Sequence, residues 1–262
     1  MVSSVSIKNH VIVIKIKSFN HSTAELVKNH IKWARNNLGE NFNGIILDLR
    51  DNRGGRLDEA IAIADLFISE GTILKTHGRH QDAKQHYIAA PNADKKSTPL
   101  IILINGMTAS AAEVLAAAIN DHNKGLVIGT HSYGKGSVQR VRHLPNNGRL
   151  NLTWTELYTP QGYSISEFGV TPKICTANRN SNSDMLLSFL TKSSISKTKS
   201  KLIDIKNLKT LLPVKNLMSV KKCKPTIKHE NSDDFELEVS INILAKNQLY
   251  QKLLVMPGNI NF

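Results

Sequence analysis

The chain has 262 residues and a formal net charge of +13, with 40% hydrophobic and 21% charged residues. This length is ample for a sizeable core, and the composition suits a soluble globular protein. No apolar run approaches the roughly 18 residues of a membrane-spanning helix, and residues 1–10 lack the basic and apolar regions of a signal peptide. Cys175 and Cys223 could pair, but they form neither a disulfide framework nor a zinc-binding spacing.

Predicted strands and helices alternate in the first half of the chain. A strand over 11–16 precedes a helix that starts with a capping-box pattern, Ser22 with Glu25, and ends before Gly39. A strand over 45–49 enters the turn D-N-R-G-G and a helix over 57–68. Residues 72–91 are predicted to form two strands joined by a polar turn. This alternation favours repeated βαβ units.

A serine lies where an apolar strand gives way to an Ala-rich helix. Residues 100–104 form a short, continuous apolar run, which predicts a strand buried on both faces, and residues 109–119 predict a tightly packed helix. Ser110 would then lie in the first helical turn, where free backbone N–H groups and the helix dipole can stabilise an oxyanion. Taken alone, the local sequence favours Thr108 or Ser110 as only a capping residue.

A lysine between two glycines follows the next predicted strand, over 125–129. In S-Y-G-K-G-S-V-Q, the glycines on both sides of Lys135 allow a sharp turn and a close approach to other groups. A lysine acts as a general base only when it is neutral, which requires burial. Ser-Lys pairs are a known variant of the serine nucleophile, so we interpret Ser110 and Lys135 as nucleophile and base. The alternative for Lys135 is a solvated turn residue.

Several ordered motifs surround these two residues: G-I-I-L-D-L-R-D-N-R-G-G, T-A-S-A-A-E, G-K-G-S-V-Q, Y-T-P-Q-G-Y-S-I and G-V-T-P. Together they resemble the carboxy-terminal processing peptidases, also called tail-specific proteases, and the match covers most of residues 42–172. The resemblance implies a serine endopeptidase that cleaves polypeptides near their C-terminus through a Ser-Lys dyad and an acyl-enzyme. It also implies the fold shared by Clp proteases and crotonases.

The resemblance assigns roles to particular residues. It implies Ser110 as the nucleophile, Lys135 as the general base and Gln139 as the group that orients the base. The oxyanion hole would consist of the N–H of Ala111 together with that of Gly54 or Gly55. The choice between the two glycines stays open, and without the resemblance D-N-R-G-G is only a tight turn between strand and helix.

Two other kinds of site receive less support. His77, His80 and His86 lack an acidic or cysteine partner at ligand spacing, so we expect neither a metal nor a cofactor. Asp121 and His122 suggest a Ser-His-Asp triad, but the hydrophilic run D-H-N-K more simply ends a helix.

The fold class that we predict is α/β, a Clp protease/crotonase-like core of βαβ units with a β-hairpin lid and a C-terminal helical extension. The hairpin spans 138–144 and 150–158 around P-N-N-G-R, because Asn-Gly tolerates positive φ. Residues 1–175 would form the catalytic core, and 176–262 a basic linker and an amphipathic helix over 235–254, capped by Asp233 and Asp234. The basic residues of 176–231 are scattered without aromatic partners, which favours a solvated extension over nucleic-acid binding.

Polypeptides, unfolded or C-terminally tagged, are the substrates implied by the resemblance, and an oligomer or a separate substrate-delivery partner would fit it. Nucleic acid and a membrane span are not expected. Family members usually carry a PDZ domain ahead of the core, for which the residues before the strand at 11–16 leave no room. The resemblance implies a periplasmic or otherwise extracytoplasmic location, and a cytoplasmic one is the alternative.

Two functions of other classes stay open. The first is a non-catalytic ligand- or protein-binding module on the same fold, which would have no use for Ser110, Lys135 and Gln139 together. The second is a crotonase-type acyl-CoA enzyme, which would share the oxyanion loops without needing Lys135.

Overall fold

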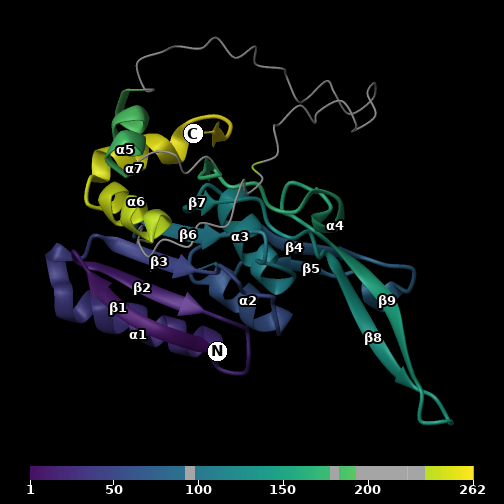
Figure 1. The fold of residues 1–262 in the computed structure, drawn as a ribbon. Coiled ribbons are helices and arrows are strands. Elements are labelled where there is room, and N and C mark those ends of the chain that lie inside the picture. Colours follow the sequence, from purple (N-terminus) through teal and green to yellow (C-terminus); the bar gives the residue numbers. More distant parts are fainter. Residues whose placement is uncertain (92–97, 178–182, 193–222, 224–233, 262) are drawn as a thin grey trace.

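The computed structural model describes residues 1–91, 98–177, 183–192, 223 and 234–261. In this part of the chain, a large sheet lies between two layers of helices, and a second sheet continues into a projecting hairpin (Figure 1). This is the α/β class that the sequence predicts. Of the predicted basic extension over 176–231, residues 176–177, 183–192 and 223 are described, and the rest lie outside the described residues. Residues 183–192 form a helix whose leucines are buried against the sheet, so this part is not the solvated segment that the sequence predicts. None of the described helices combines the length and the apolar character needed to cross a bilayer.

Seven described strands form the large sheet, and every pair but the first is parallel. In spatial order they are β1 (Val2–Lys8), β2 (Val11–Ile16), β3 (Gly44–Asp48), β6 (Leu100–Ile104), β7 (Leu126–Gly129), β10 (Ile174–Cys175) and β11 (Ile260–Asn261). The sequence does not predict the edge strand β1, because only Val2 and Val5 are partly buried and serines interrupt any apolar pattern.

The central strand β6 is buried on both faces, as its continuous apolar run predicts. Leu100, Ile102 and Ile104 pack against one helical layer, and Ile101 and Leu103 pack against the other. The first layer consists of α1 (Thr23–Leu38), α2 (Leu57–Asp65) and α3 (Ala111–Asp121), and the second of α5 (Ser183–Lys192), α6 (Phe235–Leu244) and α7 (Asn247–Val255). The small side chains of α3 let it pack closely on the sheet.

The start of α1 differs from the predicted capping box. Ser22 has a φ of 66° and makes no side-chain cap. Instead, the carboxylate of Glu59 on α2 accepts hydrogen bonds from Ser22 N at 3.1 Å and Ala24 N at 2.8 Å. A neighbouring helix therefore supplies the acceptor that a local glutamate was predicted to provide, and the same contact joins α1 to α2.

The second sheet is antiparallel and contains the predicted hairpin. Its strands, in spatial order, are β5 (His86–Ile88), β4 (Thr72–His77), β9 (Arg149–Tyr158) and β8 (Ser137–His143). The turn between β8 and β9 contains Asn147 with a φ of 61°, in the P-N-N-G-R segment. The long β8–β9 hairpin projects from the body of the molecule (Figure 1). Three short helices are η1 (Gly39–Asn41), η2 (Gln81–Ala83) and α4 (Ile165–Phe168).

The C-terminal segment folds differently from the single amphipathic helix predicted over 235–254. It forms two helices, α6 and α7, and α6 is buried around most of its circumference. The break lets Tyr250 on α7 reach the start of β6, where its hydroxyl donates to Leu100 O at 3.1 Å and accepts from Leu100 N at 3.0 Å. Asp234 caps α6 by accepting from Leu237 N, as predicted. Cys175 and Cys223 form a disulfide, with Cα atoms 5.8 Å apart.

We expect Glu59→Ala to lower the free energy of unfolding by about 1–2 kcal/mol, because it removes both acceptors from the start of α1. The matched change Ser22→Ala should alter it by less than about 0.5 kcal/mol, because the Ser22 side chain caps nothing. Urea unfolding of both variants checks this. The reverse order would show that the cap resides in Ser22.

Candidate functional site

Ser110 lies at the junction of β6 and α3, in a backbone conformation that few side chains adopt. Its φ is 59° and its ψ is −123°. The helix therefore begins at Ala111, and Ser110 is its N-cap residue, whereas the sequence predicts a place in the first turn. A positive φ on a non-glycine residue costs about 1–3 kcal/mol and is found where surrounding contacts enforce it. The half-buried Ser110 is therefore held at the end of the helix by its neighbours.

The main contact that holds this segment is a buried carboxylate. Glu113 lies in the first turn of α3, is fully buried, and accepts four hydrogen bonds. The donors are Ser110 N at 2.8 Å, Ser132 Oγ at 2.5 Å, Gly134 N at 2.6 Å and Lys135 N at 2.8 Å. A single oxygen, Oε2, accepts from both Ser110 and Lys135, so one atom joins the serine turn to the lysine loop.

The environment of Glu113 also affects its ionisation. Burial, the larger effect, raises the pKa of Glu113 above its ordinary value of 4.5, and the four donors oppose this shift. A further contact fixes the loop that carries Lys135, because Ser132 Oγ accepts a hydrogen bond from Val170 N at 2.7 Å. The glutamate, the serine turn and the lysine loop thus form one connected hydrogen-bond network.

A third segment, the loop that follows β3, packs against Ser110. Asn52 is fully buried, its carbonyl accepts from Ala109 N at 2.9 Å, and its side chain donates to Ile16 O at 2.8 Å. Gly54 has a φ of +99°, and a methyl group on it would lie 2.8 Å from Ser110 Cβ. Glycine is required here because the loop backbone touches the serine.

The two glycines of this loop differ in how their N–H groups are used. Gly54 N donates to Asn52 Oδ1 at 2.8 Å. Gly54 O accepts from Phe19 N, and because the peptide is trans, the N–H of Gly55 points to the opposite side, away from Phe19. Among the described residues, no hydrogen-bond acceptor is found for the N–H of Gly55 or for that of Ala111. Both groups could therefore receive a ligand oxygen.

The lysine site differs from the prediction. The backbone of Lys135 is held beside the serine turn, and Gly136 packs against the Ile165 and Ser166 backbone, as close-approach glycines do. The Lys135 side chain, however, is exposed, and so is Gln139 on β8. Over the ranges that the structure describes, no hydrogen bond joins Ser110 Oγ, the Lys135 side chain and Gln139. The burial that a neutral lysine requires is absent here, because β8 is an edge strand that projects into solvent.

The Ser-His-Asp alternative is not supported. Asp121 and His122 lie at the C-terminal end of α3, while Ser110 lies at its N-terminal end, about 16 Å away along an 11-residue helix. His122 Nε2 contacts Thr72 O at 2.6 Å, and Asp121 accepts from Gln161 N at 3.0 Å. Both side chains therefore have structural partners far from the serine.

Sequence reasoning assigned no role to Glu113, Asn52 or Ser132. A signal for Glu113 was present, because Ser110 and Glu113 match the capping-box spacing. The T-A-S-A-A-E motif also contains the glutamate. Asn52 and Ser132 act through buried contacts with distant residues, and no local pattern predicts these contacts.

Comparison with known proteins agrees with the motifs. A model of peptidase family S41 matches residues 10–176. The chain belongs to peptidase family S41. Among curated proteins, the carboxy-terminal-processing protease of Bartonella bacilliformis is 45% identical to this S41 chain over 135 residues, which are 52% of the chain and 31% of that protein. Carboxyl-terminal-processing peptidase 2 of Arabidopsis thaliana, a chloroplastic protein, is 37% identical over 159 residues, 61% of this chain and 30% of that one.

A solved structure shows the same fold. The photosystem II D1 C-terminal processing protease matches the S41 chain with a TM-score of 0.55 and 29% identity, over 62% of this chain and 41% of that one. The S41 chain spans about a third of the length of the curated relatives it matches. The family model ends at residue 176, so α5, α6 and α7 lie beyond the matched part.

The raised pKa of Glu113 predicts a pH-dependent stability. A group whose pKa is higher in the folded state contributes stability below its unfolded pKa and loses it as the pH rises through the folded value. The free energy of unfolding of the wild type, relative to Glu113→Gln, should therefore fall as the pH rises from about 4 towards neutrality. Urea unfolding of both proteins across this pH range measures the difference between their free energies of unfolding. The contributions of other titrating groups cancel in this difference. Parallel curves for the two proteins would contradict it.

Proposed function

We propose that this chain is the catalytic part of a serine endopeptidase that cleaves polypeptides near their C-terminus through an acyl-enzyme. The observation that carries the proposal is the Glu113 carboxylate, which holds a positive-φ Ser110 and the Lys135 loop on one oxygen atom. A capping residue needs no lysine loop tied to the same carboxylate oxygen. The family relationship supports the same function.

The oxyanion hole in this proposal consists of two backbone N–H groups. Ala111 N is the first N–H of α3 and benefits from the helix dipole. Gly55 N is the second, because Gly54 N is already bound to Asn52 Oδ1 while Gly55 N points away from Phe19. Gly54 contributes by its lack of a side chain, which lets the loop pack on Ser110.

Lys135 is the general base in this proposal. Neutral Nζ takes the proton of the Ser110 hydroxyl as Oγ attacks the substrate carbonyl carbon, and the tetrahedral oxyanion binds the two N–H groups. The intermediate collapses, the peptide C–N bond breaks, and Nζ returns the proton to the leaving amine. Water then attacks the ester carbonyl and gives a proton to Nζ. Nζ returns this proton to Ser110 Oγ as the C–Oγ bond breaks, which releases the new C-terminal carboxylate and restores neutral Nζ.

Substrate binding has to supply the desolvation that a neutral Lys135 requires, because its side chain is exposed. We propose that an extended polypeptide covers Lys135 and that the β8–β9 hairpin acts as a lid. Gln139 on β8 would orient the lysine once the side chains are enclosed. This arrangement fits the Clp protease/crotonase-like core predicted over 1–175, with the later residues as an extension.

We further propose unfolded or C-terminally tagged polypeptides as substrates, an extracytoplasmic site of action, and an oligomer or separate partner that delivers substrate. These proposals rest on the family resemblance.

We expect Ser110→Ala and Lys135→Ala each to lower the rate of casein hydrolysis about a thousandfold or more. Wild-type activity should rise from about pH 6 to about pH 10, because general-base catalysis requires an unprotonated base. Lys124→Ala, which removes another exposed lysine just beyond α3, is the matched control and should leave the rate unchanged.

Equal hydrolysis by the wild type and Ser110→Ala would reject the serine mechanism. Loss in Ser110→Ala without loss in Lys135→Ala would reject the lysine as base. No hydrolysis by any form, with normal binding of an unfolded polypeptide, would favour the non-catalytic binding module.

A further inference from the structure

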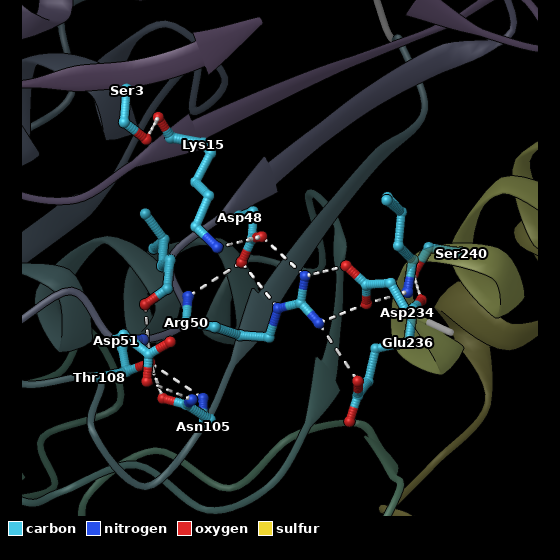
Figure 2. Close-up of polar contacts among 12 residues, drawn as sticks. Ser3, Lys15, Asp48, Arg50, Asp51, Asn105, Thr108, Asp234, Glu236 and Ser240 are labelled. Carbon is cyan, nitrogen blue, oxygen red and sulfur yellow. Dashed lines mark hydrogen bonds and ion pairs between the residues drawn. The ribbon is translucent and has the colours of Figure 1, made fainter. Parts of the chain in front are cut away.

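One guanidinium joins the C-terminal segment to the loop beside Ser110. Arg50, two residues after β3, points towards the N-terminal end of α6, and Figure 2 shows it between Asp48 on one side and Asp234 and Glu236 on the other. Arg50 and Asp234 are 184 positions apart in the sequence. The contact therefore joins two segments that lie far apart in the sequence.

The geometry is close and largely bidentate. Arg50 donates to both oxygens of Asp48, at 2.9 and 2.7 Å, and to both oxygens of Asp234, at 2.5 and 2.7 Å. A fifth bond reaches Glu236 Oε2 at 3.2 Å. Paired N–H donors of this kind fix the orientation of the guanidinium as well as its position, which a lysine could not do.

Burial makes this cluster sensitive to the loss of a partner. The side chains of Arg50, Asp48 and Glu236 are 13%, 5% and 4% exposed, and that of Asp234 is 41% exposed. Desolvation by itself would raise the pKa of Asp234, but the hydrogen bonds and charge of Arg50 outweigh it and lower that pKa. Removing one partner of a buried charged group is strongly unfavourable, because the remaining charge stays desolvated.

The backbone that follows Arg50 leads directly to the serine. Asp51 N donates to Asn105 Oδ1 at 3.0 Å, and Asn105 Nδ2 returns a bond to Asp51 at 2.9 Å (Figure 2). The backbone carbonyl of Asn52 then accepts a hydrogen bond from Ala109 N, and its side-chain Oδ1 accepts one from Gly54 N. Asp51 is adjacent to Arg50 and Asn52 follows it, so one short stretch of backbone joins the guanidinium to the loop that packs on Ser110.

We infer that Asp234 and Glu236 of α6 are positioning residues for the loop 50–55, and that through Arg50 they set the oxyanion donor beside Ser110. The inference rests on the proposed function for its catalytic meaning. Both carboxylates lie beyond residue 176, where the family model ends, so this support comes from outside the matched part of the chain. Thr176 Oγ1 donates a hydrogen bond to the other carboxylate oxygen of Glu236 at 3.1 Å, and this contact joins α6 to the end of β10.

The first test is steady-state kinetics of Asp234→Asn on an unfolded or peptide substrate. Asp234 is the half-exposed partner, so this variant is the one most able to fold. We expect kcat to fall about tenfold with KM within about twofold, because misplaced oxyanion donors weaken transition-state binding more than substrate binding. The inhibition constant of a peptide aldehyde, whose adduct with serine carries an oxyanion, should rise by about the same factor as kcat falls.

Glu238→Gln is the matched control. Glu238 is exposed on the same helix and is not among the partners of Arg50, so its substitution should leave kcat and the aldehyde inhibition constant unchanged. A rise in KM alone in Asp234→Asn, or equal effects of the two substitutions, would overturn the inference.

The second test needs no catalysis. Backbone amide exchange of residues 49–57, followed by mass spectrometry, should become about tenfold faster in Asp234→Asn and stay unchanged in Glu238→Gln. If the wild type proved inactive, the proposed function would fail while this measurement still decided whether α6 holds the loop. Unchanged exchange of that segment in Asp234→Asn would overturn the positioning role whatever the kinetics.

Discussion

A carboxylate that is fully removed from solvent must find hydrogen-bond donors, and this requirement organises the centre of the molecule. Glu113 takes its donors from two segments, the turn at Ser110 and the loop over 132–135. Neither segment could move away without leaving a buried acceptor unsatisfied. The unfavourable backbone of Ser110 is thereby offset by a contact that also brings the lysine loop to it.

The parallel sheet explains why these loops meet. The loop over 50–55, the turn at Ser110 and the segment leading to Lys135 follow β3, β6 and β7, which are neighbours in the sheet. Carboxyl ends of parallel strands lie at one edge, where open α/β sheets usually bind ligands. Helices on both faces bury β3, β6 and β7 completely, so the three loops extend from a rigid base.

Local sequence predicted those features that local sequence determines. The apolar run over 100–104 gave the central strand, Asn-Gly gave the β8–β9 turn, and ordered motifs gave the family. Other features depend on residues that lie far apart in the sequence, so no short pattern predicts them. They are the pairing of Arg50 with Asp234, the cap of α1 by Glu59 and the break between α6 and α7. The exposure of Lys135 has the same origin, because this residue lies just before the edge strand β8, and only the tertiary fold shows this.

The distance along the chain between Arg50 and α6 has a consequence for synthesis. The ribosome synthesises a chain from its N-terminus. The serine turn, its glutamate and the lysine loop have all been synthesised well before residue 234, at a point when the guanidinium still lacks its second pair of acceptors. A growing chain therefore holds Ser110 beside a loop whose Arg50 is only partly paired, and α6 supplies the missing carboxylates. The loop over 50–55 reaches its final set of contacts only after α6 has been synthesised.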